Sequence, residues 1–275
     1  MLALLLATLL FYYRRRAARR RKRVFLLGPG AGACGAVLRA TGHAVTLATD
    51  HEYDVNGRRY PPGWVAMRGV PLAEAEAVED YACSSRNLAT WASKLYLPGP
   101  PRALAGIDLD GVAAADQSRA ATEFVRPQPE RDFGCIVAGS RGGQVTLPAM
   151  WLLGCERPAV VVNAGLLRDE CGWVWPPGVP VVALAGGKDF FAENDDDDAY
   201  VARLWRAVPP ASRAVTALVF VPSMEHKVDG EMLRALLPDL VAAATTRLRR
   251  RPRGGYGFAC RLVVEANAPE GEWIS

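Results

Sequence analysis

Short apolar runs recur along the chain, and each is closed by glycine, proline or charged residues. Runs of this length, bounded in this way, are typical of buried strands. They are Val24–Leu27, Ala44–Ala48, Cys135–Ala138, Ala159–Val162, Val181–Ala185 and Ala217–Val221. Segments with helical character separate several of them. The pattern therefore predicts an α/β fold, with a mostly parallel sheet flanked by helices.

Three segments are predicted to be helices that cover this sheet. Residues 33–40 form a short candidate, and residues 143–153 a second one with a kink or break at Pro148. Residues 229–246 form the last, and its pattern is interrupted by Pro238.

Composition divides the chain of 275 residues into three parts. Residues 1–23 are an apolar stretch followed by a polybasic one. Residues 24–246 are long enough to bury one large core, and residues 51–108 within them predict an insertion that either caps the substrate pocket or packs its aromatic residues in a satellite core. Residues 247–275 are a basic tail that either adds an edge strand or is disordered. Residues 110–124 are a further helix candidate.

Charge is unevenly distributed between these parts. The whole chain has a formal net charge of +4, but residues 24–246 taken alone are near −7. A body with net negative charge is poorly suited to bind the phosphate backbone of nucleic acid, so no nucleic-acid partner is predicted. The basic ends could instead contact an anionic membrane surface.

The apolar stretch Met1–Tyr13 is short for a membrane span. As a helix it reaches about 20 Å, whereas a bilayer core is about 30 Å thick. Together with the basic residues that follow, it predicts a marginal membrane anchor that leaves the body facing the cytoplasm. An organelle-targeting segment and an incorrectly assigned start codon are the alternatives, with a soluble cytoplasmic or organellar protein as the result.

The cysteines and histidines do not predict a metal site. None of the six cysteines forms a Cys-x-x-Cys pair, and no histidine lies in a cluster with ligand spacing. The cysteines are expected to be reduced and mostly buried, and neither a metal nor a cofactor is predicted. Four consecutive acids at residues 195–198 could hold a cation or supply a substitute carboxylate, but a solvated helix start is the simpler interpretation.

The strongest chemical signal follows the strand Cys135–Ala138. The sequence there continues as Gly139-Ser140-Arg141-Gly142-Gly143. Small residues on both sides of a serine predict a tight turn between strand and helix, which exposes the hydroxyl and directs the first helical amides towards it. The usual pattern has glycine two positions before the serine, and here that position is Ala138.

An acid and a base follow the ends of two later strands. Asp189 comes after the run that ends at Ala185, and His226 comes after the run that ends at Val221. His226 is one of three histidines and the only one beyond this acid. Because the carboxyl ends of parallel strands meet at one sheet edge, Ser140, Asp189 and His226 are expected to lie close together.

These motifs resemble those of the α/β-hydrolase superfamily, and of its small serine esterase and dienelactone-hydrolase-like members. The stretch Val24–Gly32 is similar to that family's first core strand and oxyanion loop. The resemblance implies a three-layer α-β-α sandwich with Ser140 as nucleophile, Asp189 as acid and His226 as base. It also implies an oxyanion hole made by the Arg141 amide and by the amide of Ala31 or Gly30. The expected activity is cleavage of a small-molecule carboxylic ester or thioester.

Two other functions stay open at this point. Gly28–Gly35 fits the Gly-x-Gly-x-x-Gly pattern of a Rossmann-type NAD(P)- or FAD-binding unit, with Asp50 at the end of the second strand. That pattern leaves Ser140, Asp189 and His226 without a role. The other alternative is a catalytically silent binding protein with the hydrolase fold.

Overall fold

A computed structural model describes sixteen segments of the chain. They are residues 11–13, 23–27, 31–49, 53–55, 58–60, 63–66, 108–109, 112–113, 134–140, 142–143, 147, 151, 156–166, 175–192, 196–268 and 270–274.

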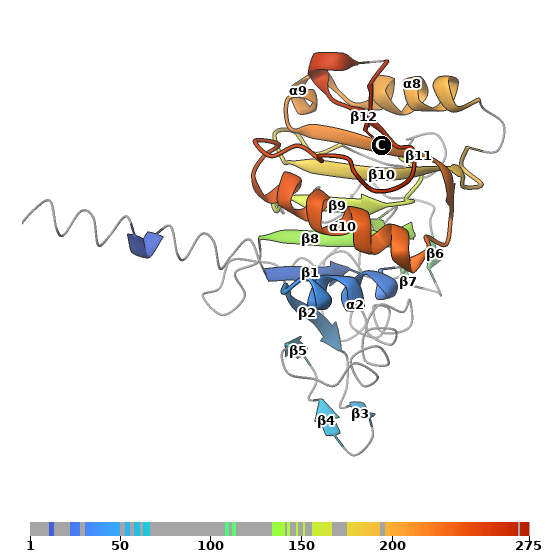
Figure 1. The fold of residues 1–275 in the computed structure, drawn as a ribbon. Helices are drawn as coiled ribbons and strands as arrows, with labels where there is room; N and C mark the ends of the chain where they lie inside the picture. The colour runs from blue at the N-terminus through green and yellow to red at the C-terminus, as the bar shows by residue number, and fades with distance from the viewer. Residues whose placement is uncertain are drawn as a thin grey trace, which may run out of the picture.

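A nine-stranded sheet runs through the centre of this described part, in the order β13-β12-β11-β10-β9-β8-β1-β2-β5 (Figure 1). The six central strands β2, β1, β8, β9, β10 and β11 are parallel to one another, and each outer strand, β5, β12 or β13, is antiparallel to its inner neighbour. Their bounds are β1 Arg23–Leu27, β2 Ala44–Thr49, β5 Gly63–Ala66, β8 Cys135–Gly139, β9 Ala159–Val162, β10 Val181–Lys188, β11 Thr216–Glu225, β12 Arg261–Val263 and β13 Glu272–Trp273. All six predicted runs are strands of this sheet.

Helices cover both faces of the sheet. The helices are α2 Gly32–Ala40, α8 Asp197–Ala207, α9 Pro210–Arg213, α10 Gly230–Thr245 and the short 3-10 helix η3 Glu265–Asn267. Helices α2 and α10 share one buried cluster with the sheet, while α8 packs into the cluster on the opposite face. The expected three-layer α-β-α fold class is therefore confirmed.

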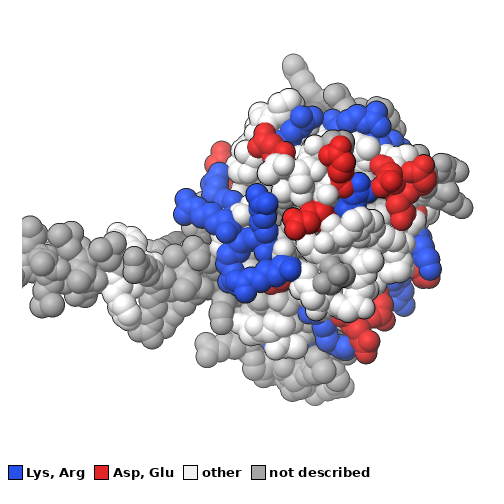
Figure 2. All heavy atoms as spheres, turned by 45° about the horizontal axis from the view of Figure 1, so that its top comes forward, with Lys and Arg blue, Asp and Glu red and all other residues white. Residues whose placement is uncertain are grey.

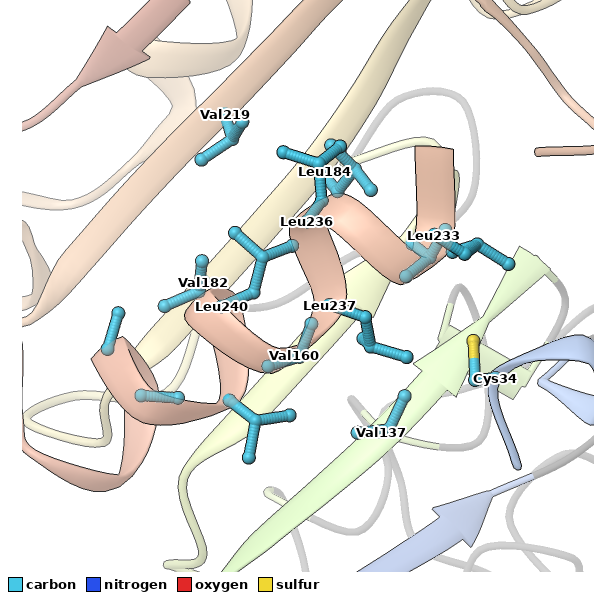
Figure 3. Packing of buried hydrophobic residues seen from close by; sticks show 14 of the residues in the cluster. Cys34, Val137, Val160, Val182, Leu184, Val219, Leu233, Leu236, Leu237 and Leu240 are labelled. Atoms are coloured by element: carbon cyan, nitrogen blue, oxygen red, sulfur yellow. The ribbon is translucent and has the colours of Figure 1, made fainter. Parts of the chain in front are cut away.

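Alternation along the strands explains why both faces are apolar. In β8, Val137 faces the α2 and α10 side, while Ile136 and Ala138 face the other. Leucines along α10 lie over the sheet side chains (Figure 3). Leu236 and Leu240 are fully buried there, and each such side chain stabilises the fold by about 1.5–3 kcal/mol.

Two helices begin at aspartates that cap their free amides. Asp196 accepts a hydrogen bond from the Ala199 amide at 2.7 Å and begins α8. Asp229 accepts from the amides of Glu231 and Met232 at 2.7 and 3.3 Å and begins α10. Asp196, Asp197 and Asp198 of the acidic run thus form the start of a helix, in agreement with the simpler interpretation given above.

Two local expectations were wrong. Helix α10 runs through Pro238 without a break, because its buried leucines hold both halves against the sheet. The helix expected over residues 110–124 is contradicted at β7, Val112–Ala113, which pairs with β6, Asp108–Leu109.

Both edges of the main sheet are formed by strands from segments whose sequence pattern predicted no definite element, residues 51–108 and 247–275. The basic tail adds β12 antiparallel to β11, and then β13, so an edge strand is formed there. Within residues 51–108, β5 extends the main sheet, and β3 Tyr53–Val55 pairs with β4 Arg58–Tyr60. Whether residues 51–108 cap a pocket stays a prediction.

No helix among the described residues has the length and apolar character needed to cross a bilayer. Residues 1–10 and 14–22, which carry most of the predicted membrane anchor, lie outside the described residues.

Candidate active site

Ser140 lies at the end of β8 in a left-handed backbone conformation, with φ of 43°. This region is disfavoured for a residue with a side chain, and it persists only where the surroundings impose it. The chain turns there from β8 into residues with helical backbone, of which Leu147 and Trp151 are buried under the sheet. The predicted tight turn is thus present, with its serine strained.

Close packing behind the turn requires Gly143. A Cβ at that position would lie 2.9 Å from both the Ala164 Cβ and the Val161 Cγ1, which is closer than non-bonded carbon atoms approach in proteins. Ala138, where glycine is usual, is fully buried among apolar neighbours on the same face of the sheet. The extra methyl group is therefore accommodated by the core.

The three predicted side chains contact one another in a continuous relay. Ser140 Oγ lies 2.9 Å from His226 Nε2. His226 Nδ1 lies 3.1 and 3.0 Å from the two carboxylate oxygens of Asp189. With the Nδ1 proton donated to Asp189, Nε2 is left as the acceptor for the serine proton, so the carboxylate determines the tautomer.

Burial differs along this relay. The Asp189 side chain is 2% exposed, whereas that of His226 is 31% exposed. Asp189 also accepts a hydrogen bond from the Phe191 amide at 3.2 Å, which helps to hold its carboxylate in place. The Asp189 carboxylate is therefore held inside the protein, while the His226 imidazole is partly exposed to solvent.

A bulge in β11 brings Asp189 and His226 together. The register of β10 and β11 shifts between the pairs Gly186–Val221 and Lys188–Glu225. A Cβ on Gly186 would lie 2.2 Å from the Met224 carbonyl oxygen, so only glycine lets the bulged strand approach. The strands consequently continue past the apolar runs from which they were predicted.

Asn163, just after β9, contacts the segment that carries His226 and was not identified by motif reasoning. It is 3% exposed and has φ of 45°. Its Nδ2 donates to the carbonyl oxygens of Glu225 and His226, at 2.8 and 3.0 Å. The strand-end rule that identified the other three residues would have included it.

Two aromatic rings adjoin the imidazole. The Phe190 ring centroid is 4.4 Å from that of His226, and the Phe191 centroid is 6.2 Å away. Phe190 is 57% exposed and lines an open depression of ≈ 540 Å³ together with Lys188, His226 and Lys227. This depression therefore borders His226 and Asp189 on the solvent side.

The predicted oxyanion donors are described in part. Ala31 is fully buried and precedes α2, at the end of the loop that follows β1. Strand β1 pairs directly with β8, so Ala31 lies at the same sheet edge as Ser140. Gly30 and Arg141 lie outside the described residues, as do Gly28 and Asp50 of the dinucleotide pattern.

No group of three metal-binding side chains occurs within the described ranges. Cys34, Cys135 and Cys260 are buried free cysteines, and burial raises the pKa of the Cys34 thiol to about 12. These thiols stay protonated near neutral pH and are poor nucleophiles or ligands.

Comparisons with known proteins add little to this geometry. No family model and no curated protein sequence matches the chain. Among solved structures, the chain is similar to XC6422 from Xanthomonas campestris, which is described as an α/β serine hydrolase without a lid. The match has 16% identity and a TM-score of 0.37, and covers 83% of this chain and 81% of that one. A function for this chain can therefore be inferred only from its own residues.

Proposed function

We propose that this protein is a serine hydrolase that cleaves a carboxylic ester or thioester through an acyl-enzyme. The observation that carries the proposal is the relay from Ser140 through His226 to Asp189, which begins at a strained serine and ends at a buried carboxylate. An isolated serine is a weak nucleophile, and this arrangement is the one that activates it.

The reaction proceeds in two halves. His226 Nε2 takes the proton of Ser140 as Oγ attacks the carbonyl carbon, and the carbonyl oxygen becomes an oxyanion. Collapse of this intermediate breaks the bond to the alcohol or thiol, which leaves with the proton from His226. Water then attacks the acyl-enzyme with His226 again as base, and the acid is released with Ser140 restored.

The oxyanion is assigned to the amides of Arg141 and of Ala31 or Gly30. Two fixed amides at that point lower the barrier, and loss of one such donor typically costs about 10²–10³ in rate. The position of Ala31 at the start of α2, beside the β8 end, supports this assignment. The mechanism uses no cofactor.

The direct test is labelling by a fluorophosphonate, followed by mapping of the modified residue. Label on Ser140, lost in Ser140→Ala and retained in the exposed control Ser223→Ala, is the expected result. Turnover of short-chain esters should disappear in the same variant. An unlabelled, folded protein would favour the silent binding protein, and a rise in melting temperature with NAD(P) or FAD would favour the dinucleotide alternative.

A further inference from the structure

We propose that the end of the molecule opposite Ser140 docks on an anionic lipid membrane through Arg247–Arg253, called here the basic turn. Five of its seven residues are arginine, and all five are exposed. This surface is separate from the relay and has no part in the proposed hydrolysis.

The basic turn is a fixed feature of the fold. Helix α10 ends at Thr245, and the backbone reverses through Arg247 and Leu248, which have φ of 53° and 59°. Leu248 packs against the core and Pro252 is buried, so the backbone is anchored on the body. The guanidinium groups are therefore presented outwards together.

The positive charges of the basic turn are not neutralised within the described part of the chain. None of its five arginines forms an ion pair there, and the Arg247 guanidinium donates to an uncharged acceptor, the Gly178 carbonyl, at 3.0 Å. The nearby Asp239 accepts instead from the Tyr256 hydroxyl and from the Arg253 backbone amide. A helix C-terminus favours one or two cations, but five in seven residues repel one another unless an external anion compensates them.

The location of the basic turn favours an anionic membrane surface as the source of the compensating negative charge. A depression of ≈ 490 Å³ beside it is lined by Gly134, Glu156, Arg157 and Arg247, among others. The Gly134 amide bonds to the Arg23 carbonyl, so the chain enters β1 at this same end. The preceding residues 1–22 carry seven more basic residues and an apolar stretch. Figure 2 shows Lys and Arg gathered on the left, the side where the parallel strands begin in Figure 1.

The relay lies at the other ends of the same strands. Strands β8 to β11 contain four to ten residues, so about 13–33 Å separates their two ends. With the basic turn on the headgroups, Ser140 faces the aqueous phase.

The test is co-sedimentation of the full chain with vesicles. Vesicles of phosphatidylcholine with about 30 mol% phosphatidylserine should bind the protein, and pure phosphatidylcholine vesicles should bind it much less. Full-length Arg249→Gln/Arg251→Gln should lower the partition coefficient about 25-fold at low salt, because each arginine near an anionic surface contributes about fivefold.

The matched control removes the same charge elsewhere. Arg206→Gln/Arg234→Gln changes two exposed arginines on α8 and α10 and should bind like the unchanged protein. Ser140→Ala should also bind normally, so failure of the hydrolase proposal would be distinguishable. Equal loss in both arginine variants, no loss in either, or tight binding to single-stranded RNA with no vesicle binding would each overturn the proposal.

Discussion

Asn163 holds His226 by its backbone, since Nδ2 of the amide donates to the His226 carbonyl oxygen at 3.0 Å. The same nitrogen donates to Glu225, so two successive carbonyls of the histidine loop are fixed to the end of β9. Both partners are acceptors, which determines the orientation of the amide. Asn163 is therefore a positioning residue for the imidazole.

Asn163→Ala should lower kcat by about 10–100-fold and leave KM nearly unchanged, because the imidazole would lose its alignment with Ser140. It should also lower the free energy of unfolding by about 1–3 kcal/mol, since two part-buried hydrogen bonds to the carbonyl oxygens of Glu225 and His226 are lost. Steady-state kinetics and denaturant unfolding measure the two effects.

Asn163→Gly separates these two effects. Glycine relieves the positive φ but supplies no donor, so stability should partly recover while kcat stays low. Full recovery of kcat in this variant would show that Asn163 has only a structural role.

Asp189→Asn should reduce kcat by about 10⁴ with the fold intact, because an amide no longer imposes the Nδ1–H tautomer or stabilises the imidazolium. Circular dichroism should be unchanged. Asp196→Asn is the matched swap, as asparagine caps α8 equally well, and it should retain full activity. Comparable loss in both variants would contradict the assignment of Asp189.

Gly186→Ala should prevent the close approach of β10 and β11. Its Cβ would lie 2.2 Å from a backbone oxygen, so the bulge that carries His226 towards Asp189 must shift. We expect loss of both activity and thermal stability. A Cβ at Gly230 has no neighbour within 4 Å and that position lacks a positive φ, so Gly230→Ala should behave like the unchanged protein.

The stability contributed by Asp229 should depend on pH. Hydrogen bonds from the amides of Glu231 and Met232 lower the pKa of this carboxyl group below its usual value. Its contribution is therefore complete above the unfolded pKa, about 3.9, and is lost as the pH falls through the lower folded value. Asp229→Ala should reduce the melting temperature at pH 7, with a smaller deficit near pH 2. A constant deficit across that range would argue against a charged cap.

The strands and the relay could be predicted because they depend on local rules. Apolar runs closed by polar residues indicated six strands, and the shared sheet edge indicated which polar residues meet. Asn163 was missed because its role is to hold a backbone, for which no reactive side chain is needed. The extensions of β10 and β11 were missed because they depend on backbone pairing across a bulge, and the side chains there are not apolar.

In helix α10, by contrast, a local rule predicted a break that the structure does not have. Pro238 predicts an interruption from local sterics, yet the helix is continuous because leucines on both sides of it are buried against the sheet. Tertiary packing outweighs a local preference of about 3 kcal/mol when several side chains contribute.

Ser140, Asp189 and His226 follow three different strands, and β11, the strand before His226, is synthesised after β8 and β10. A growing polypeptide that has completed β8 and β10 already holds the alcohol and the acid but has no imidazole beside them. The proposed chemistry can therefore start only after β11 and His226 have been synthesised and folded onto β10. Catalytic turnover would report completion of this part of the sheet, and products truncated before His226 would be inert.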